Sequence, residues 1–368
     1  MGISSYQISS VLALLPEVGL VVLAGVVLTM DILLKDSRKH LLAVTTAVGS
    51  LLIILAALMY SQPSGDLIWG GMVRDDMLAF VFRLVFIFAG GITAMFSIGS
   101  KEVAHRGDYY AIMLGAVIGM CFMASASDLI MLYLAIETTG IAGYLLAGYV
   151  RTDDRSAEAG LKYFLFGAAT SAVMLYGFSL LYGFTGETNL GAIAPILASG
   201  SVSISAICAI VVLILVGVGF KIAMVPFHFW APDVYEGAPS PVTGFISTAS
   251  KTAGFAVLLR VFIYGLAASE YWLPAMAGLA AVTMTFGNLV ALAQTNIKRL
   301  LAYSSVAHAG YALVAFVAYS ELGVASAIFY LIAYVVTNLA AFGVVIVFAH
   351  TAGTDDIQQY AGMSRRSP

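Results

Sequence analysis

The segment FKIAMVPFHFWAPDVYEGAPSP, residues 220–241, follows a run of fifteen residues, 206–220, that carries no charge. Lys221, Pro226 and His228 then come within eight residues. A proline at position 226 removes the backbone hydrogen bond to position 222 and strains the turn before it. Broken helices at membrane depth are tolerated where they line a cavity. The segment therefore predicts a buried helix that breaks beside a lysine.

The composition indicates that the whole chain lies in a membrane. Of its 368 residues, 61% are hydrophobic and only 10% are charged, whereas soluble domains carry about 25% charged residues. No soluble fold of this size has enough interior to hide so much apolar surface. The sequence therefore predicts an all-α, polytopic helical bundle that forms a single membrane domain over residues 1–368. It has no long basic run, so it does not predict nucleic-acid binding.

Runs of about 20 apolar residues are long enough to cross a bilayer as helices. The N-terminal run lacks a basic stretch before it and continues to Leu34, so we expect a retained first span instead of a cleaved signal peptide. A tight turn at 124–128 separates the fourth and fifth runs. The predicted spans are 11–34, 41–60, 77–99, 109–126, 128–149, 157–184, 203–227, 241–265, 272–293, 301–319 and 322–349.

The basic residues of the loops predict the orientation of the chain. Eleven follow odd-numbered spans, whereas the opposite loops hold only Arg74. The positive-inside rule then places the N-terminus outside. The eleven residues are Lys35, Arg38, Lys39, Lys101, Arg106, Arg151, Arg155, Lys298, Arg299, Arg365 and Arg366.

The other five basic residues fall within the predicted spans, and Glu137 lies near the middle of the fifth span. A charge at the centre of a membrane helix costs about 2.5–3.5 kcal/mol, and such residues mark ion or proton paths. We expect Arg83 and Arg260, near the outer ends, to extend towards the interface. The other four are Glu137, Lys162, Lys221 and Lys251. One carboxylate cannot pair with three lysines, and a buried lysine without a partner can release its proton.

Structural roles remain open for several of these residues. Glu137 could have a purely structural role, in which it pairs with Lys162 and holds two helices together. Lys162 could also be an interfacial anchor. His228 could be an ordinary loop histidine. The stretch 231–241, which contains three prolines with Asp233 and Glu236, fits a vestibule lining and a rigid turn equally well.

Motifs for redox cofactors and metals are absent from the sequence. Cys121 and Cys208 lie in apolar runs without the spacing of a metal or iron–sulfur site. The stretch GVGF at 217–220 lacks the pattern of a dinucleotide site. We expect no cofactor and no metal in this chain.

The segment 220–256 resembles the signature region of the antiporter-like membrane subunits of respiratory complex I. The stretches 129–149, 158–172 and 296–311 support the resemblance, which extends over nearly the whole chain. Segment 160–177 also aligns with segment 326–343, five spans later, and an odd offset inverts topology. The resemblance implies fourteen helices with two inverted five-helix repeats, each with a broken helix. It divides the chain into N-terminal helices (1–108), a first repeat with a broken seventh helix (109–265) and an incomplete second repeat (266–368), because family members continue beyond position 368 with three more helices.

The resemblance also implies roles for individual residues. Glu137 matches a buried glutamate that pairs with Lys162, and Lys221 matches the central lysine of the broken helix. Lys251 matches a bridging lysine, with His228 between it and Lys221. His308, in the tenth helix, is a further candidate for the path.

The implied function is proton translocation in the membrane arm of an NADH:quinone oxidoreductase, coupled to quinone reduction elsewhere in the complex. NAD, FMN, iron–sulfur clusters and quinone are expected in partner subunits, and the other membrane subunits and the lipid bilayer are the expected partners. The expected location is the bacterial inner membrane. The alternatives are a subunit of a multisubunit cation/proton antiporter or membrane-bound hydrogenase, and a non-transporting scaffold of the membrane arm.

Overall fold

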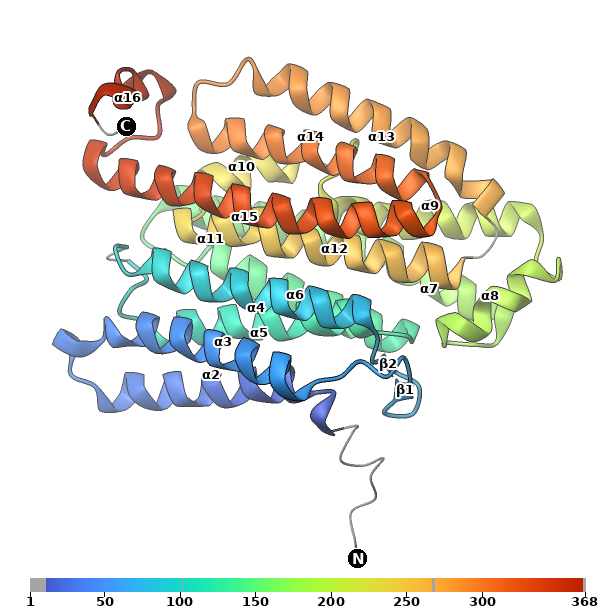
Figure 1. Cartoon of the computed structure of the whole chain (residues 1–368). Helices are drawn as coiled ribbons and strands as arrows, with labels where there is room; N and C mark the ends of the chain where they lie inside the picture. Colours follow the sequence, from blue (N-terminus) through green and yellow to red (C-terminus); the bar gives the residue numbers. More distant parts are fainter. Residues whose placement is uncertain (1–10, 101, 267–268, 367–368) are drawn as a thin grey trace, which may run out of the picture.

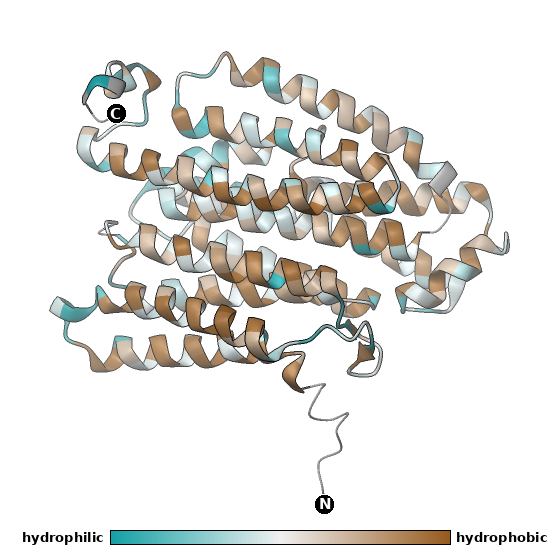
Figure 2. Cartoon of the chain, viewed as in Figure 1, coloured by the Kyte–Doolittle hydropathy of each residue, from teal (hydrophilic) through white to brown (hydrophobic). Residues whose placement is uncertain are grey.

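The computed structural model describes residues 11–100, 102–266 and 269–366. The long helices run side by side in one bundle, and successive helices run in opposite directions (Figure 1). Among the described residues, eleven helices are long and apolar enough to cross a membrane, so the predicted number of spans is confirmed. Apolar residues dominate these helices along their length (Figure 2).

The bundle has two distinct ends. The end that holds the connections at residues 35–40 and 148–153 is called the basic end, and the end that holds β1, β2 and α8 is called the hairpin end (Figure 1). The spans are α2 (Leu15–Leu33), α3 (Leu41–Tyr60), α4 (Met77–Ser97), α5 (Gly107–Ser125), α6 (Leu129–Ala147), α7 (Asp154–Thr185), α9 (Ile204–Ile222), the eighth span (Ser240–Gly265), α13 (Ser269–Ala291), α14 (Ile297–Val317) and α15 (Glu321–Ala352). The short elements are β1 (Leu67–Ile68), β2 (Val73–Arg74), α8 (Leu190–Ala198), α10 (Trp230–Gly237), α16 (Met363–Arg366) and two 3₁₀ turns (Asp36–Arg38 and Ile357–Tyr360).

The turn between α5 and α6 lies where the sequence places it. Asp128 accepts hydrogen bonds from the backbone N–H groups of Ile130 and Met131 and so begins α6 with a side-chain cap. A backbone bridge also joins Val73 of β2 to Ala126, and another joins Asp128 to Asn189. The hairpin end is therefore tied together by backbone contacts between segments that are far apart in the sequence.

The predicted break in the seventh span is present, but it comes earlier than Pro226. Helix α9 ends at Ile222, and Ala223 takes a left-handed conformation with φ of 55°. The Met224 N–H donates to the carbonyl oxygen of Gly219 (2.8 Å), which closes the helix end. Trp230 Nε1 donates to the carbonyl oxygen of Phe220 (3.0 Å), another group that the break releases. The span thus ends at 222 instead of 227 because a C-terminal cap forms before the proline.

The chain resumes after the break as a helix and not as an irregular turn. Helix α10 covers Trp230–Gly237 and packs against α7 and α14. Asp233 lies in its first turn. Most of the stretch 231–241 is therefore helical, and its acidic side chains have a fixed direction.

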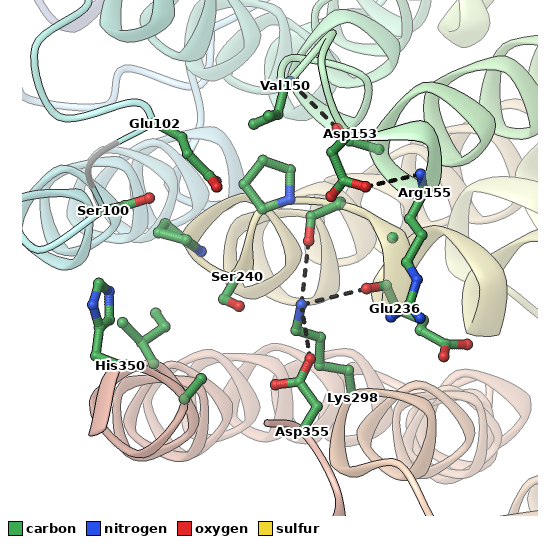
Figure 3. A pocket seen from close by; sticks show the side chains of 17 residues that line it. Ser100, Glu102, Val150, Asp153, Arg155, Glu236, Ser240, Lys298, His350 and Asp355 are labelled. Carbon is green, nitrogen blue, oxygen red and sulfur yellow. Dashed lines mark hydrogen bonds and ion pairs between the residues drawn. The ribbon is translucent and has the colours of Figure 1, made fainter. Parts of the chain in front are cut away.

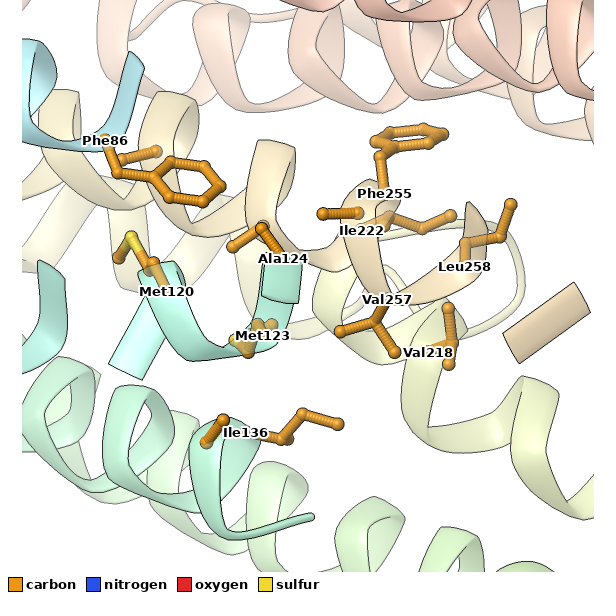
Figure 4. Close-up of a cluster of buried hydrophobic side chains, with 14 of the residues drawn as sticks. Phe86, Met120, Met123, Ala124, Ile136, Val218, Ile222, Phe255, Val257 and Leu258 are labelled. Atoms are coloured by element: carbon orange, nitrogen blue, oxygen red, sulfur yellow. The ribbon is translucent and has the colours of Figure 1, made fainter. Parts of the chain in front are cut away.

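The eighth span is almost completely buried and contains two irregularities that the sequence did not predict. It consists of α11 (Ser240–Phe245), a π-helical segment (Ile246–Ser250), α12 (Lys251–Leu258) and a second π-helical segment (Leu259–Gly265). Such π segments occur often at functional sites. Lys251 directly follows the first segment, and Arg260 lies in the second. Apolar side chains of α12 pack together with those of α4, α5, α6 and α9 (Figure 4).

The prediction for the two arginines was wrong. Arg83 and Arg260 are each only 1% exposed, so neither reaches the interface. Arg83 Nε donates to Glu17 Oε1 (2.7 Å), and Arg260 donates to both carboxylate oxygens of Asp76 (2.6 Å each). Carboxylates of neighbouring segments offset the cost of burying each guanidinium group. The position of an arginine along its own helix does not indicate that such partners are present.

Candidate functional site

Lys221 lies in the last turn of α9, immediately before the break, and its side chain is buried. A methyl group placed on Gly254 of α12 would lie 3.2 Å from Lys221 Cβ, and one placed on Gly140 of α6 would lie 3.6 Å from Lys221 Nζ. The lysine therefore extends from α12 towards α6. Gly140 is one turn from Glu137, which places the ammonium within coulombic reach of that carboxylate. The end of α9 also carries the negative end of the helix dipole, which favours a cation.

Lys251 is buried among hydroxyl groups and an aromatic ring. Its Nζ donates to Ser305 Oγ of α14 (2.5 Å) and lies 5.7 Å from the centre of the Tyr235 ring. Ser305 in turn donates to the carbonyl oxygen of Ala302 (2.6 Å) and lies 3.4 Å from Tyr235 Oη. Within the described part of the chain, no carboxylate lies within 4.0 Å of the ammonium of Lys251 or of Lys221.

Beyond Lys251, a small cavity leads to His308. The cavity measures about 10 Å³, close to the space that one water needs. Lys251, Ser305, His308 and Tyr330 all line it. His308 Nδ1 lies 2.5 Å from Tyr330 Oη on α15. The structure thus brings His308 and Lys251 to one cavity.

His228 lies in the break and is buried, so it is not a solvent-exposed loop histidine. Its ring packs against Phe229, Phe286 of α13 and Tyr303 of α14. Its Nδ1 is buried and has no hydrogen-bond partner among the described residues. The imidazole is within coulombic reach of Lys251, so it can interact electrostatically with that lysine.

The predicted pair between Glu137 and Lys162 does not form. Glu137 accepts a hydrogen bond from Ser171 of α7. Lys162 comes nine residues earlier in α7, about 13 Å along the helix axis from Ser171. Its ammonium instead contacts Glu158 (2.7 Å) and Asp233 (2.6 Å). Glu137 therefore faces a hydroxyl on α7 because the lysine lies at another level of the bundle.

Lys162 belongs to a charged cluster at the basic end that was not predicted from the sequence. Asp233 of α10 accepts from Lys162 and from Arg299 Nη1 (2.8 Å), and Arg299 Nη1 also donates to Glu236 (2.8 Å). Burial raises the pKa of the Asp233 carboxyl, but the hydrogen bonds and charges of Lys162 and Arg299 lower it by more, so the net pKa is below its usual range. Acidic residues in a stretch without basic ones were the available signal for this cluster.

Next to this cluster, the bundle opens in a polar cavity of about 500 Å³ (Figure 3). Lys298 Nζ points into it, donates to the carbonyl oxygens of Glu236 (3.3 Å) and Ala238 (3.4 Å), and lies 3.4 Å from Asp355. Ser240, at the start of the eighth span, also lines the cavity. A water-filled vestibule can therefore reach the end of the helix that carries Lys251, which favours the vestibule interpretation of 231–241 over the rigid turn.

Four titratable residues follow one another through the bundle: the half-buried Glu137, the buried Lys221 and Lys251, and the half-buried His308. Charges in this row can influence one another, and the hydroxyls of Ser305, Tyr235 and Tyr330 can pass protons between them. Among the described residues, no three His, Cys, Asp or Glu side chains are grouped as a metal site. The row of titratable side chains and hydroxyl groups is suited to moving protons.

Residues 126–368 match the family described as NADH:quinone oxidoreductase/Mrp antiporter, transmembrane. NADH-quinone oxidoreductase subunit N 2 of Chloroherpeton thalassium is 40% identical over 371 residues, which cover 97% of this chain and 72% of that protein. NAD(P)H-quinone oxidoreductase subunit 2 of a Synechococcus species is 42% identical over 362 residues, 97% of this chain and 68% of that protein.

Solved structures agree with these sequence relationships. A chain of respiratory complex I from Thermus thermophilus is 33% identical, with a TM-score of 0.77 over 96% of this chain and 75% of that chain. An archaeal membrane-bound sulfane sulfur reductase contains a chain that is 25% identical, with a TM-score of 0.85 over 98% of this chain and 75% of that one. A chain of the Mrp complex from a Dietzia species shares the fold, with 22% identity and a TM-score of 0.80 over 92% of this chain and 38% of that chain.

Proposed function

Because this chain belongs to the membrane-subunit family of NADH:quinone oxidoreductases and Mrp antiporters, we propose that it is a proton-translocating membrane-arm subunit of an NADH:quinone oxidoreductase. One observation carries the residue-level proposal. Lys221 and Lys251 are both buried next to irregular helix segments, and among the described residues neither ammonium has a carboxylate within 4.0 Å. Such lysines can exchange a proton at modest cost, whereas a tightly ion-paired lysine would hold it.

The first step uses Glu137 and Lys221. The charge of Glu137 stabilises the ammonium form of Lys221, because the carboxylate lies on the face of α6 towards which that side chain extends. Removing this stabilisation, by moving or protonating Glu137, favours release of the proton. Each proton moved against 100 mV needs about 2.3 kcal/mol. At an effective dielectric constant of about 20, two charges about 4 Å apart interact by about 4 kcal/mol and two charges about 7 Å apart by about 2.4 kcal/mol, so a pair separated by more than 4 Å can still supply an energy of this size.

The second step passes the proton from Lys221 to Lys251. Lys221 packs against Gly254, one turn from Lys251 on the same helix. His228 faces this region from the break and can stabilise or relay the proton. From Lys251 the route continues through Ser305 and the small cavity to His308 and Tyr330. The cavity at Lys298 supplies water from the basic end.

The subunit would work in a larger assembly in the bacterial inner membrane with its N-terminus outside. Its neighbours would be the other membrane subunits, including sister antiporter-like chains. NAD, FMN, iron–sulfur clusters and quinone would bind to partner subunits, and their redox chemistry would drive this chain from a distance. The assignment of residues 1–108 to N-terminal helices, of 109–265 to a first five-helix repeat and of 266–368 to three helices of a second, inverted repeat is part of this proposal.

A second candidate is a subunit of a cation/proton antiporter or a membrane-bound hydrogenase, which would use the same buried charges. The observation that supports it is the shared fold of the Mrp chain. That chain is 22% identical, whereas the quinone oxidoreductase subunits are about 40% identical over nearly the whole chain. The first proposal therefore has the stronger support.

Lys221→Ala in the assembled complex tests the proposal. We expect NADH-driven acidification of inside-out membrane vesicles to be lost, while the complex still assembles. Lys35→Ala is the matched control, because Lys35 is exposed at the basic end and its loss should leave pumping unchanged. Normal acidification per NADH oxidised in the Lys221 variant would reject a central role for this lysine.

A further inference from the structure

A buried triad at the hairpin end stands apart from the row of central residues. Glu17 of α2 is 3% exposed, and its Oε1 accepts from Arg83 Nε of α4 at 2.7 Å. Arg83 Nη1 also lies 3.6 Å from Oδ1 of Asp75, which precedes α4. One guanidinium therefore serves two carboxylates.

Local structure places the three side chains together. Glu17 lies in the first turn of α2, directly after Pro16, where an acidic side chain is favoured by the helix dipole. Asp75 and Asp76 directly follow β2, and their side chains have different partners. Asp75 turns towards Arg83, and Asp76 turns towards Arg260. The two arginines thus have separate partners.

The charges of the triad do not balance. Arg83 carries one positive charge, and Glu17 and Asp75 carry two negative charges when both are ionised. The other charged groups nearby do not correct this. Arg260 is held by both oxygens of Asp76, and Arg74 packs 6.0 Å from the centre of the Tyr264 ring. From α5, the thiol of Cys121 faces the triad and supplies no positive charge.

Two polar atoms of the triad are buried without a partner among the described residues: Glu17 Oε2 and Arg83 Nη2. The Nε and Nη2 groups of a guanidinium can hold both oxygens of one carboxylate side by side. Here only the Nε bond forms. Leaving a charged oxygen buried without a donor is unfavourable, and a proton on that oxygen lowers the cost because a neutral carboxyl group is less costly to bury than a charged one. Asp75, in contrast, accepts a backbone hydrogen bond from Ser64 on its Oδ2 (3.3 Å).

We propose that Glu17 binds one proton on Oε2, which makes the Glu17–Arg83–Asp75 triad a proton-binding site separate from the central lysines. The proton comes from water at the hairpin end, forms an O–H bond on Oε2, and leaves Oε1 as the acceptor of the Arg83 Nε–H. Asp75 is the more exposed of the two carboxylates and is the first acceptor on the way in. Proton binding neutralises the triad, and proton loss lets Arg83 hold both oxygens of Glu17. The contact between α2 and α4 thereby responds to protons on this side of the bundle.

Infrared spectroscopy of the full chain in lipid nanodiscs tests the proposal. A protonated carboxyl group gives a C=O stretching band that shifts on exchange into deuterium oxide. At neutral pH, Glu17→Gln should remove the band area of one carboxyl group per chain. Asp75→Asn should remove the same area although Glu17 is still present, because Arg83 then neutralises Glu17 alone. Asp66→Asn changes an exposed acid of the same loop and should leave the band intact.

Two results would overturn the proposal. If Glu17→Gln and Asp75→Asn both leave the wild-type band unchanged, Glu17 is ionised and the triad is a static ion pair. If the band is lost in Glu17→Gln but kept in Asp75→Asn, the shared arginine is not the cause of proton binding. If the Glu17 variant does not fold, a band that is kept in Asp75→Asn still overturns the proposal.

Discussion

The buried arginines at the hairpin end and the buried lysines at the centre are equally inaccessible, but their surroundings differ. Arg260 donates to both oxygens of Asp76 and to the carbonyl oxygen of Ala124 (2.7 Å). Lys251 instead donates to a serine hydroxyl. Lys221 lies against a glycine-lined helix face. Burial alone therefore does not distinguish a fixed charge from a mobile proton.

The difference follows from the chemistry of the two side chains. Arginine keeps its proton in proteins and offers a planar fork that matches a carboxylate. Lysine carries a compact charge and can become a neutral amine when its environment is apolar. At the hairpin end, arginines thus form fixed ion pairs between segments. At the centre, lysines occupy the positions where we propose that a proton binds and is released.

The largest effect on stability is expected from Arg260→Gln, which removes the ion pair between Arg260 and Asp76. The substitution leaves the largely buried Asp76 without its partner, and breaking a buried pair in this way costs about 3–5 kcal/mol. We expect the variant to accumulate poorly in membranes. Quantitative blotting of the chain and its melting temperature in detergent measure the loss.

Two further variants isolate the cause of that loss. Asp76→Asn combined with Arg260→Gln removes both charges, and asparagine can still cap α4, so the double variant should be more stable than Arg260→Gln alone. Arg74→Gln changes a partly exposed arginine at the same end and should have little effect. If the double variant is as unstable as the single one, the unpaired carboxylate is not responsible.

The lysine side of the comparison predicts loss of function without loss of the protein. Lys251→Arg keeps the charge, but arginine cannot release its proton. We expect the assembled complex to persist and vesicle acidification to be lost. Ser305→Ala removes only the hydrogen-bond partner, and we expect about tenfold slower pumping, equivalent to about 1.4 kcal/mol.

The same variants separate a pump from a scaffold. A scaffold needs only a correctly packed chain, so NADH oxidation and acidification would continue in the Lys251→Arg complex once assembly is shown by native gel electrophoresis. Unchanged pumping in Lys251→Arg would contradict the proton-carrier role of Lys251.

Hydropathy predicted the eleven spans because each needs about 20 predominantly apolar residues to cross the bilayer. The break near Lys221 was also predictable, since Pro226 cannot donate a backbone hydrogen bond. The end of α9 at Ile222 depends on the left-handed conformation of Ala223 and on the hydrogen bond from the Trp230 side chain, which the sequence does not show. The two π-helical segments of the eighth span likewise have no marker in composition or periodicity.

For the site, the cost of burying a charge was enough to single out Glu137, Lys221 and Lys251. The choice of partners was not predictable in the same way. Glu137 meets Ser171 and not Lys162, because α6 and α7 bring those two residues to the same level. Asp233 reaches Lys162 only because the chain resumes as a helix after the break. Pairing depends on the axial register of neighbouring helices, which a single sequence does not contain.

The smallest effect on stability is expected at the basic end, where Lys162 is intermediate between the ion-paired arginines and the unpaired lysines. Lys162 is paired like an arginine, but its side chain and that of Asp233 are each 37% exposed, so the pair contributes about 1 kcal/mol or less. Although burial raises the pKa of Asp233, Lys162 and Arg299 hold it below its usual range. The pair therefore adds stability above the ordinary carboxyl pKa of about 3.9, and that stability is lost as the pH falls through the lower value of the folded chain.

Asp233→Asn should lower the melting temperature slightly at neutral pH and bring the variant and wild-type curves together as the pH falls below the pKa of folded Asp233. The amide introduced by this substitution stays neutral throughout, so the difference between the two proteins measures the ionised carboxylate alone. Asp36→Asn, an exposed acid at the same end, serves as the matched control and should give a smaller difference. If the gap between wild type and Asp233→Asn is the same at every pH, Asp233 does not contribute through its charge, and Lys162 is only an interfacial anchor. If the difference in melting temperature between wild type and Asp233→Asn instead disappears at low pH, Lys162 resembles the buried arginines, because its carboxylate partners hold it as a fixed cation. Lys221 and Lys251 are then the lysines that remain free to exchange protons.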